Sequence, residues 1–165
     1  MQIKAWRFIA ILFTALLMTQ GFVHLWQLPS RLAYEGVLWF DTLTFYVRFG
    51  PEGPGPFIEV AALLTTLVLV FVVRRRQPAF TLTLVAFAAL ALSTAAWWLF
   101  IYPVNRELLT WTAETLPQNW MEFRNQWEYT HSARGVLMFI ALVLLVYSVI
   151  HETPDEVVRT EPKNN

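Results

Sequence analysis

The chain of 165 residues contains no cysteine, and only 15% of its residues are charged. The absence of cysteine excludes disulfide exchange, thiolate catalysis, iron–sulfur clusters and covalent c-type haem. It therefore also excludes the thiol–quinone oxidoreductases. The charged share lies well below the average of about 25% for soluble domains, which indicates a lipid environment. The formal net charge is zero, and the basic residues are scattered apart from one short cluster, so we expect no nucleic-acid partner.

Apolar residues are abundant and make up 56% of the chain. A membrane-spanning helix needs about 20 mostly apolar residues. Segments of this kind cover approximately residues 8–28, 57–73, 79–102 and 132–150. We therefore predict an all-α integral membrane protein built as a four-helix bundle. The transmembrane domain occupies residues 1–151, and the polar segment 152–165 is predicted to be a disordered cytoplasmic tail.

Two connections between the predicted spans have structure of their own. Residues 30–49, within the first loop from 29 to 56, are rich in aromatic and aliphatic side chains and predict a short interfacial helix. The glycine- and proline-rich run 50–56 then breaks regular structure. In the second loop, 103–129, residues 104–112 are predicted to extend the third helix after a kink at Pro103.

The fourth helix is predicted to be longer than its apolar part. Asn119 is suited to an N-cap, and Glu122 three residues later completes the pattern of a capping box. The helix is therefore expected to begin near Trp120 and to end near Ile150. It is then longer than the membrane requires and projects from the bilayer on the outer side.

Lysine and arginine placement predicts the orientation. The short flanks assigned to the inside contain a concentrated basic set: Lys4, Arg7, Arg74, Arg75, Arg76, Arg159 and Lys163. Because cytoplasmic flanks are enriched in lysine and arginine, both termini are predicted to be cytoplasmic.

Polar side chains inside the spans are costly in lipid and therefore usually face the interior of a bundle. Gln20, His24 and Gln27 are spaced i, i+4 and i+7 and share one face of the first helix. They either hydrogen-bond neighbouring helices as a packing device or contribute to a site. Glu59 lies in the first turn of the second helix, where the helix dipole favours an acid. It alternatively pairs with His24 or Arg134, or binds a cation.

The fourth helix has the densest set of polar and aromatic residues. Spacings of 4, 3, 4 and 3 place one stripe on a single face: Trp120, Arg124, Trp127, His131 and Arg134. Glu128 and His131 are neighbours at i and i+3. They could form an acid–base dyad, part of a metal site of the Glu-x-x-His type, or an ion pair that anchors the helix end. Asn105 follows Pro103 and either contributes to a site or fills the kink with hydrogen bonds.

The predicted topology brings these residues to one depth. His24, Glu59, Asn105, Glu128, His131 and Arg134 come from all four helices and lie near their outer ends. We therefore predict a pocket that opens toward the outer leaflet and is ringed by aromatic residues. The expected substrate-binding residues are Trp127, Trp120, Glu59, Gln20, Gln27 and Trp111.

Four segments carry a family resemblance, namely residues 21–32, 57–59, 103–111 and 124–134. With their Pro-x-Asn and Trp-Glu-x-x-His-x-x-Arg elements, they resemble the anthrone oxygenase-like membrane family over approximately residues 20–150. The resemblance implies a four-helix membrane fold and O2 chemistry on an aromatic compound. Fungal members are associated with oxidising an anthrone to an anthraquinone, whereas most bacterial members have unknown function. We expect this chain in a bacterial inner membrane.

Three functions stay open from the sequence. In the first, an oxygenase-like enzyme uses His131, oriented by Glu128, as a base, Arg134 and Asn105 stabilise an oxyanion, and His24 is a second base. In the second, a metal or haem protein uses His24 and His131 as ligands, with Glu59 and Glu128 as carboxylates. In the third, a non-enzymatic protein transports a solute or binds a partner. The expected partners are membrane lipid, a lipophilic small molecule and further copies of the chain, and the cofactor is unknown.

Overall fold

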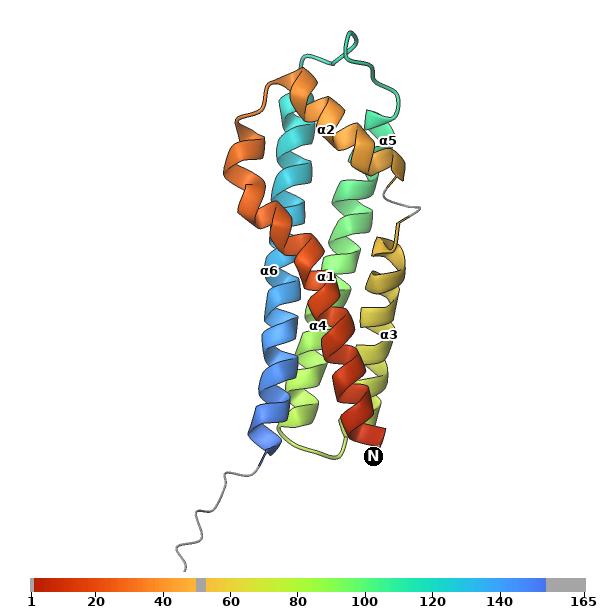
Figure 1. Ribbon diagram of the computed structural model, residues 1–165, viewed down its shortest axis with the longest axis vertical. Helices are drawn as coiled ribbons and strands as arrows, with labels where there is room; N and C mark the ends of the chain where they lie inside the picture. Colours follow the sequence, from red (N-terminus) through yellow and green to blue (C-terminus); the bar gives the residue numbers. More distant parts are fainter. Residues whose placement is uncertain (1, 50–52, 154–165) are drawn as a thin grey trace, which may run out of the picture.

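Every segment of regular structure in the described part of the chain is helical. The computed structural model describes residues 2–49 and 53–153 (Figure 1). Four of its helices are long and apolar enough to cross a membrane, with α4, η2 and α5 counted together as one span. The predicted all-α membrane bundle is therefore confirmed.

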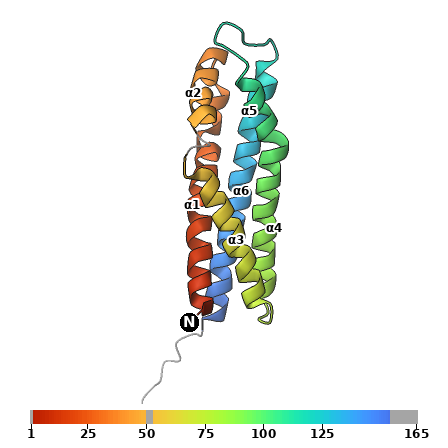
Figure 2. The same ribbon diagram turned by 90° about the vertical axis from the view of Figure 1, so that its right-hand side faces the viewer.

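The helices follow one another as α1 (Gln2–Leu32), α2 (Gly36–Phe49), α3 (Gly55–Val73), α4 (Ala79–Ala96), η2 (Trp97–Ile101), α5 (Tyr102–Leu108) and α6 (Trp120–Glu152). The four long helices form a ring in which α1 contacts α3 and α6, while α4 contacts the same two helices. The N-terminus and the end of α6 lie at one end of the bundle (Figure 1). The short helix α2 crosses the other end, close to α5 and the start of α6 (Figure 2).

The first helix extends beyond the predicted loop boundary. We expected the chain to leave the helix at Pro29, but α1 includes this proline and ends at Leu32. Proline removes one backbone donor, a loss that transmembrane helices tolerate. Two residues after Pro29, the buried Arg31 donates a side-chain hydrogen bond from Nε to Gln27 Oε1 at 3.0 Å. The predicted second helical segment is present as α2, and α3 begins two residues before the predicted Phe57.

The third span contains a π-helical turn. Regular α-helix ends at Ala96, and Trp97–Ile101 form η2, in which the backbone N–H of Tyr102 donates to the carbonyl of Trp97. Pro103 follows at once and has no backbone N–H, so the wider turn lies where the α-helical pattern is interrupted. The helix then continues as α5, which confirms the predicted extension, although it ends at Leu108 and not at residue 112.

The fourth helix begins at Trp120 as expected and ends at Glu152, two residues beyond the predicted Ile150, but its predicted cap is wrong. Helix α6 has 33 residues and a length of about 50 Å. Asn119 precedes it without a side-chain hydrogen bond to the helix backbone. Its Nδ2 instead donates to Glu122 Oε2 at 3.4 Å, so the two side chains bond each other and form no capping box. The predicted disordered tail began at residue 152, but Glu152 belongs to α6 and pairs with Arg7; the rest of the prediction, for residues 154–165, lies outside the described residues.

Two apolar clusters divide the bundle along its length. Toward the termini, small and aliphatic residues are buried together: Ala10, Leu17, Ala62, Leu69, Val73, Ala86, Leu90, Met138, Ala141 and Leu145. At the other end an aromatic-rich cluster joins α2, η2, α5 and α6. Helices α1 and α6 cross closely between the clusters, since a Cβ added to Gly135 would lie 2.5 Å from the carbonyl oxygen of Gly21. Glycine is required there for the backbones to approach.

Candidate active site

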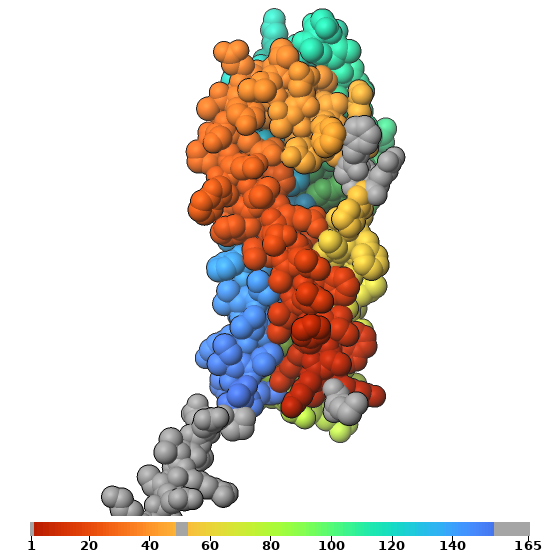
Figure 3. Space-filling view, viewed as in Figure 1, coloured from red at the N-terminus to blue at the C-terminus, as the bar shows by residue number. Residues whose placement is uncertain are grey.

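A cavity of about 540 Å³ lies beyond the helix crossing, between α1, α3, the α4–α5 span and α6. The end of α2 adds Tyr46 and Val47 to its wall. Of the residues predicted for the site, those that line it are Gln20, His24, Glu59, Asn105, Trp127, His131 and Arg134. Figure 3 shows a hollow between α1–α2 and the start of α3, through which the third span and α6 are visible.

An ion pair joins α3 to α6 at this cavity. Arg134 Nη2 and Glu59 Oε1 lie 2.7 Å apart, and the same carboxylate oxygen accepts a hydrogen bond from Thr94 Oγ1 at 2.8 Å. Arg134 Nε donates to the carbonyl of Ser93 at 3.0 Å. Both charges are therefore paired and hydrogen-bonded, as groups inside a bundle must be. Of the alternatives for Glu59, the pairing with Arg134 is the one that the structure confirms.

Three rings pack together along one wall. The His131 imidazole lies on the Trp127 indole, with ring centroids 3.8 Å apart and planes inclined by 29°. The His24 ring approaches both, with its centroid 4.4 Å from that of His131 and 5.1 Å from that of Trp127. The predicted convergence of α1 and α6 is thus confirmed for these two histidines.

Backbone and amide contacts orient this wall. His131 Nδ1 lies 3.1 Å from the carbonyl oxygen of Trp127. Because a carbonyl only accepts, this contact selects the imidazole tautomer protonated at Nδ1 and leaves a lone pair on Nε2. Trp127 Nε1 donates to Asn105 Oδ1 at 2.8 Å. The Asn105 amide nitrogen, Nδ2, keeps its donors free of partners among the described residues.

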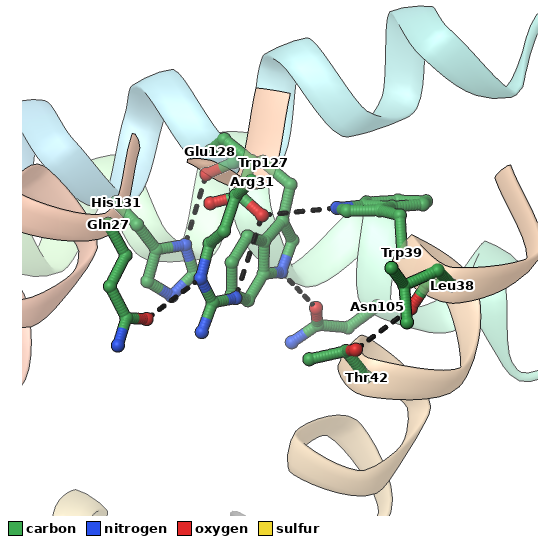
Figure 4. A network of polar contacts seen from close by, with 9 residues as sticks. All are labelled: Gln27, Arg31, Leu38, Trp39, Thr42, Asn105, Trp127, Glu128 and His131. Carbon is green, nitrogen blue, oxygen red and sulfur yellow. Dashed lines mark hydrogen bonds and ion pairs between the residues drawn. The ribbon is translucent and has the colours of Figure 1, made fainter. Parts of the chain in front are cut away.

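The predicted dyad of Glu128 and His131 is wrong. The fully buried Glu128 accepts a hydrogen bond from Trp39 Nε1 at 3.1 Å and lies 3.6 Å from Arg31 Nη1 (Figure 4). Glu128 therefore interacts with the Arg31 cation from α1 and the Trp39 donor from α2. Its neighbour at i+3, His131, is not its partner. We name Gln27, Arg31, Trp39 and Glu128 the rear network, because it lies behind the Trp127 ring and outside the cavity lining.

Three predicted substrate-binding residues do not line the cavity. Gln27 belongs to the rear network. The Trp120 ring packs against Trp39, with centroids 6.1 Å apart, and Trp111 is buried beside Phe40 and Phe123. The two tryptophans therefore pack within the end of the bundle that holds the site, and the structure does not place them in the cavity wall.

The sequence reasoning missed several side chains that build the site. Arg31 continues the stripe of Gln20, His24 and Gln27 with the next spacing of four, but the helix was predicted to end before it. Thr94 and Ser93 gave no signal, since single hydroxyl residues are common in spans. The remaining missed residues of the lining include Tyr46, Trp97, Trp98 and Met138.

The predicted metal ligands are not gathered into one cluster. Within the described residues, no group of three or more histidine, aspartate or glutamate side chains is placed to hold a metal ion. His24 and His131 are adjacent, but Glu59 pairs with Arg134 and Glu128 with Arg31. The four candidates therefore do not form a common ligand set.

Fold and site together define a helical membrane protein with a polar and aromatic cavity near one end of its bundle. The chain belongs to the anthrone oxygenase family, whose sequence profile, described as anthrone oxygenase, matches residues 53–144. The match includes every cavity residue contributed by α3 through α6 and leaves out those of α1 and α2. Neither the comparison with curated proteins nor the comparison with solved structures gave a match.

Proposed function

We propose that this protein is a membrane oxygenase that oxidises a lipophilic aromatic carbon acid of the anthrone type with O2 in the cavity. The observation that carries the proposal is the state of His131. Its Nδ1 is held by the Trp127 carbonyl, and its Nε2 has no partner among the described residues. An imidazole fixed in this way is a general base in a pocket that also offers aromatic surfaces for stacking.

The first step is removal of a proton. His131 Nε2 takes one hydrogen of the substrate methylene, and the electron pair delocalises onto the substrate carbonyl oxygen. The Asn105 amide and the Arg134 guanidinium are donors near the developing oxyanion, and both residues line the cavity. Because their partners Trp127 and Glu59 hold them in place, they need little reorganisation during the reaction.

The following steps consume one O2. The carbanion carbon transfers its electrons to O2 and forms a C–O bond, and the imidazolium returns its proton to give a hydroperoxide. His131 then removes the second methylene hydrogen, the O–O bond breaks, and a carbonyl and water form. The balance is CH2 + O2 → C=O + H2O, in which carbon is oxidised and O2 is reduced. His24, beside His131, acts as a second base or as a hydrogen-bond partner for the substrate.

The substrate is proposed to arrive through the lipid. Val60 on α3 and Trp98 on η2 both line the cavity, yet 55% and 58% of these residues are exposed. They therefore lie where the cavity meets the lipid-facing surface. With both termini cytoplasmic, as the basic flanks favour, this opening lies in the outer leaflet of the membrane.

The test is oxygen uptake by detergent-purified protein supplied with an anthrone. His131→Ala is expected to reduce turnover by about 10²–10⁴-fold, the usual contribution of a general base. His151→Ala, on the exposed end of α6, is the matched control and should keep the wild-type rate. Melting curves of all three proteins establish that each is folded. An unchanged rate in folded His131→Ala would contradict the proposed base, and no uptake by folded wild type would contradict the reaction.

A further inference from the structure

A second cavity, of about 460 Å³, lies at the opposite end of the bundle between α1 and α6. Its lining residues are Lys4, Arg7, Phe8, Ile11, Val149, Glu152 and Thr153. Charged groups occupy the part nearest the helix ends, and apolar side chains lie further along the helices toward the middle of the membrane. The cavity is therefore amphipathic along the bilayer normal.

Positive charge exceeds negative charge around this cavity. Glu152 is the only acidic residue that the described part of the chain has at this end, and it lies beside Arg7 and 3.7 Å from Arg76. One carboxylate thus forms ion pairs with two guanidinium groups. Lys4, Arg74 and Arg75 have no ion pair within the described residues, and Arg7 Nε is enclosed without a hydrogen-bond partner. An anion in the cavity would meet the unpaired Lys4 ammonium and the Arg7 guanidinium, whereas Arg74 and Arg75 lie outside the lining.

We propose that this cavity binds an anionic phospholipid. Its phosphate interacts with Lys4 and Arg7, and an acyl chain lies along Phe8, Ile11 and Val149. Phe8 is 67% exposed, so its ring is available to the chain. Basic cavities between transmembrane helices on the cytoplasmic side suit anionic headgroups. A free phosphate would use the cations but would leave the apolar part of the cavity without a partner. The proposal does not depend on the proposed oxygenase reaction.

The experiment measures lipid retained by the purified full-length protein. Wild type in detergent is mixed with equal amounts of phosphatidylglycerol and phosphatidylcholine, and bound lipid is counted by native mass spectrometry. We expect selective retention of phosphatidylglycerol. One basic residue near an anionic headgroup contributes about 1 kcal/mol, so Lys4→Gln should weaken retention about fivefold. Lys4 has no ion pair to lose, and the fold is expected to survive, which a melting curve checks.

Three further measurements can overturn the proposal. Arg75→Gln removes the same charge at the same end but outside the cavity, and it should leave retention unchanged. Equal losses in Arg75→Gln and Lys4→Gln would contradict a defined site.

Phe8→Ala should also weaken retention of the lipid, and unchanged binding would contradict the acyl-chain contact. Displacement of the lipid by millimolar inorganic phosphate would identify a site for a free anion, and equal retention of both lipids would contradict headgroup recognition.

Discussion

The two halves of the bundle are built from the same helices but are held together by different interactions. In the half toward the termini, α1, α3, α4 and α6 bury small and aliphatic residues against one another. Three of its buried hydroxyls, on Thr14, Thr66 and Thr83, have no hydrogen-bond partner, whereas that of Ser148 donates to the Leu145 carbonyl. In the other half the same helices diverge around a cavity and hold paired charges and stacked rings. The threonine hydroxyls buried in the first half are incidental to packing, whereas the ion pair and the stacked rings of the second half fix the geometry of the cavity.

The largest expected effect comes from breaking the ion pair of the cavity half. Glu59→Leu leaves the Arg134 guanidinium without its partner, which should lower the free energy of unfolding by about 3–5 kcal/mol. Denaturant unfolding in detergent, followed by tryptophan fluorescence, measures the change. The double variant Glu59→Leu/Arg134→Met removes both charges and should recover much of the loss. If the double variant lost as much free energy of unfolding as Glu59→Leu and Arg134→Met together, the coupling between Glu59 and Arg134 would be contradicted.

A smaller effect is expected from the rear network. Trp39→Phe removes the hydrogen bond to Glu128 while keeping an aromatic ring, at a cost of about 1.5–3 kcal/mol for a bond to a charged group. Hydrogen exchange should increase first in α2, because Trp39 ties this helix to α6. Trp111→Phe, at a buried tryptophan with no side-chain hydrogen bond, is the matched control. Equal exchange in both variants would argue against a specific role of Glu128.

The boundary between the halves can be tested at the helix crossing. Gly135→Ala places a methyl group 2.5 Å from the Gly21 carbonyl oxygen, so α1 and α6 must move apart, at about 1–3 kcal/mol. Gly36→Ala is the comparison, since the three atoms nearest to its new methyl group all belong to the Trp120 side chain, the first at 3.0 Å. Melting temperatures should fall more for Gly135→Ala. The reverse order would mean that the backbone crossing is not a constraint.

The smallest effect is expected in the terminal half. Thr83 is fully buried, and its hydroxyl has no partner. Replacing it with valine keeps the shape and removes an unsatisfied polar group, so Thr83→Val should change stability by less than about 0.5 kcal/mol or increase it. Thermal unfolding beside Thr94→Val provides the contrast, because Thr94 bonds Glu59. A large loss of stability in Thr83→Val would contradict the proposed distinction between the two halves of the bundle.

Much of the fold was predictable because lipid restricts the choices. A span must be a helix, and its costly polar residues must face inward, so the four spans and the convergence of His24, Glu59, Asn105, His131 and Arg134 could be read from the sequence. The matched profile and the quoted motifs agree on the family.

Two of the wrong predictions share one physical origin. Spacing along a helix reveals near neighbours, so Glu128 was assigned to His131, but the partners it has in the structure come from α1 and α2. Finding them required knowing that α1 continues through Pro29 and carries Arg31 inward. A proline usually ends a helix in water, and nothing in the local sequence says that this one does not. Tertiary contacts decided both outcomes.

The π turn at Trp97–Ile101 allows the third span to hold one additional residue without changing the direction of the helix that follows. A π turn accommodates one residue more than an α-helical turn does, in about the same rotation. Deleting one residue within this turn would therefore restore a regular helix and leave Asn105 at the cavity wall. In the regular part of α4 each residue rotates the helix by about 100°, so deleting one residue there would turn Asn105 away from the cavity if the preceding turns stayed in place. The third span therefore tolerates the loss of a residue at the π turn and not in the helix before it.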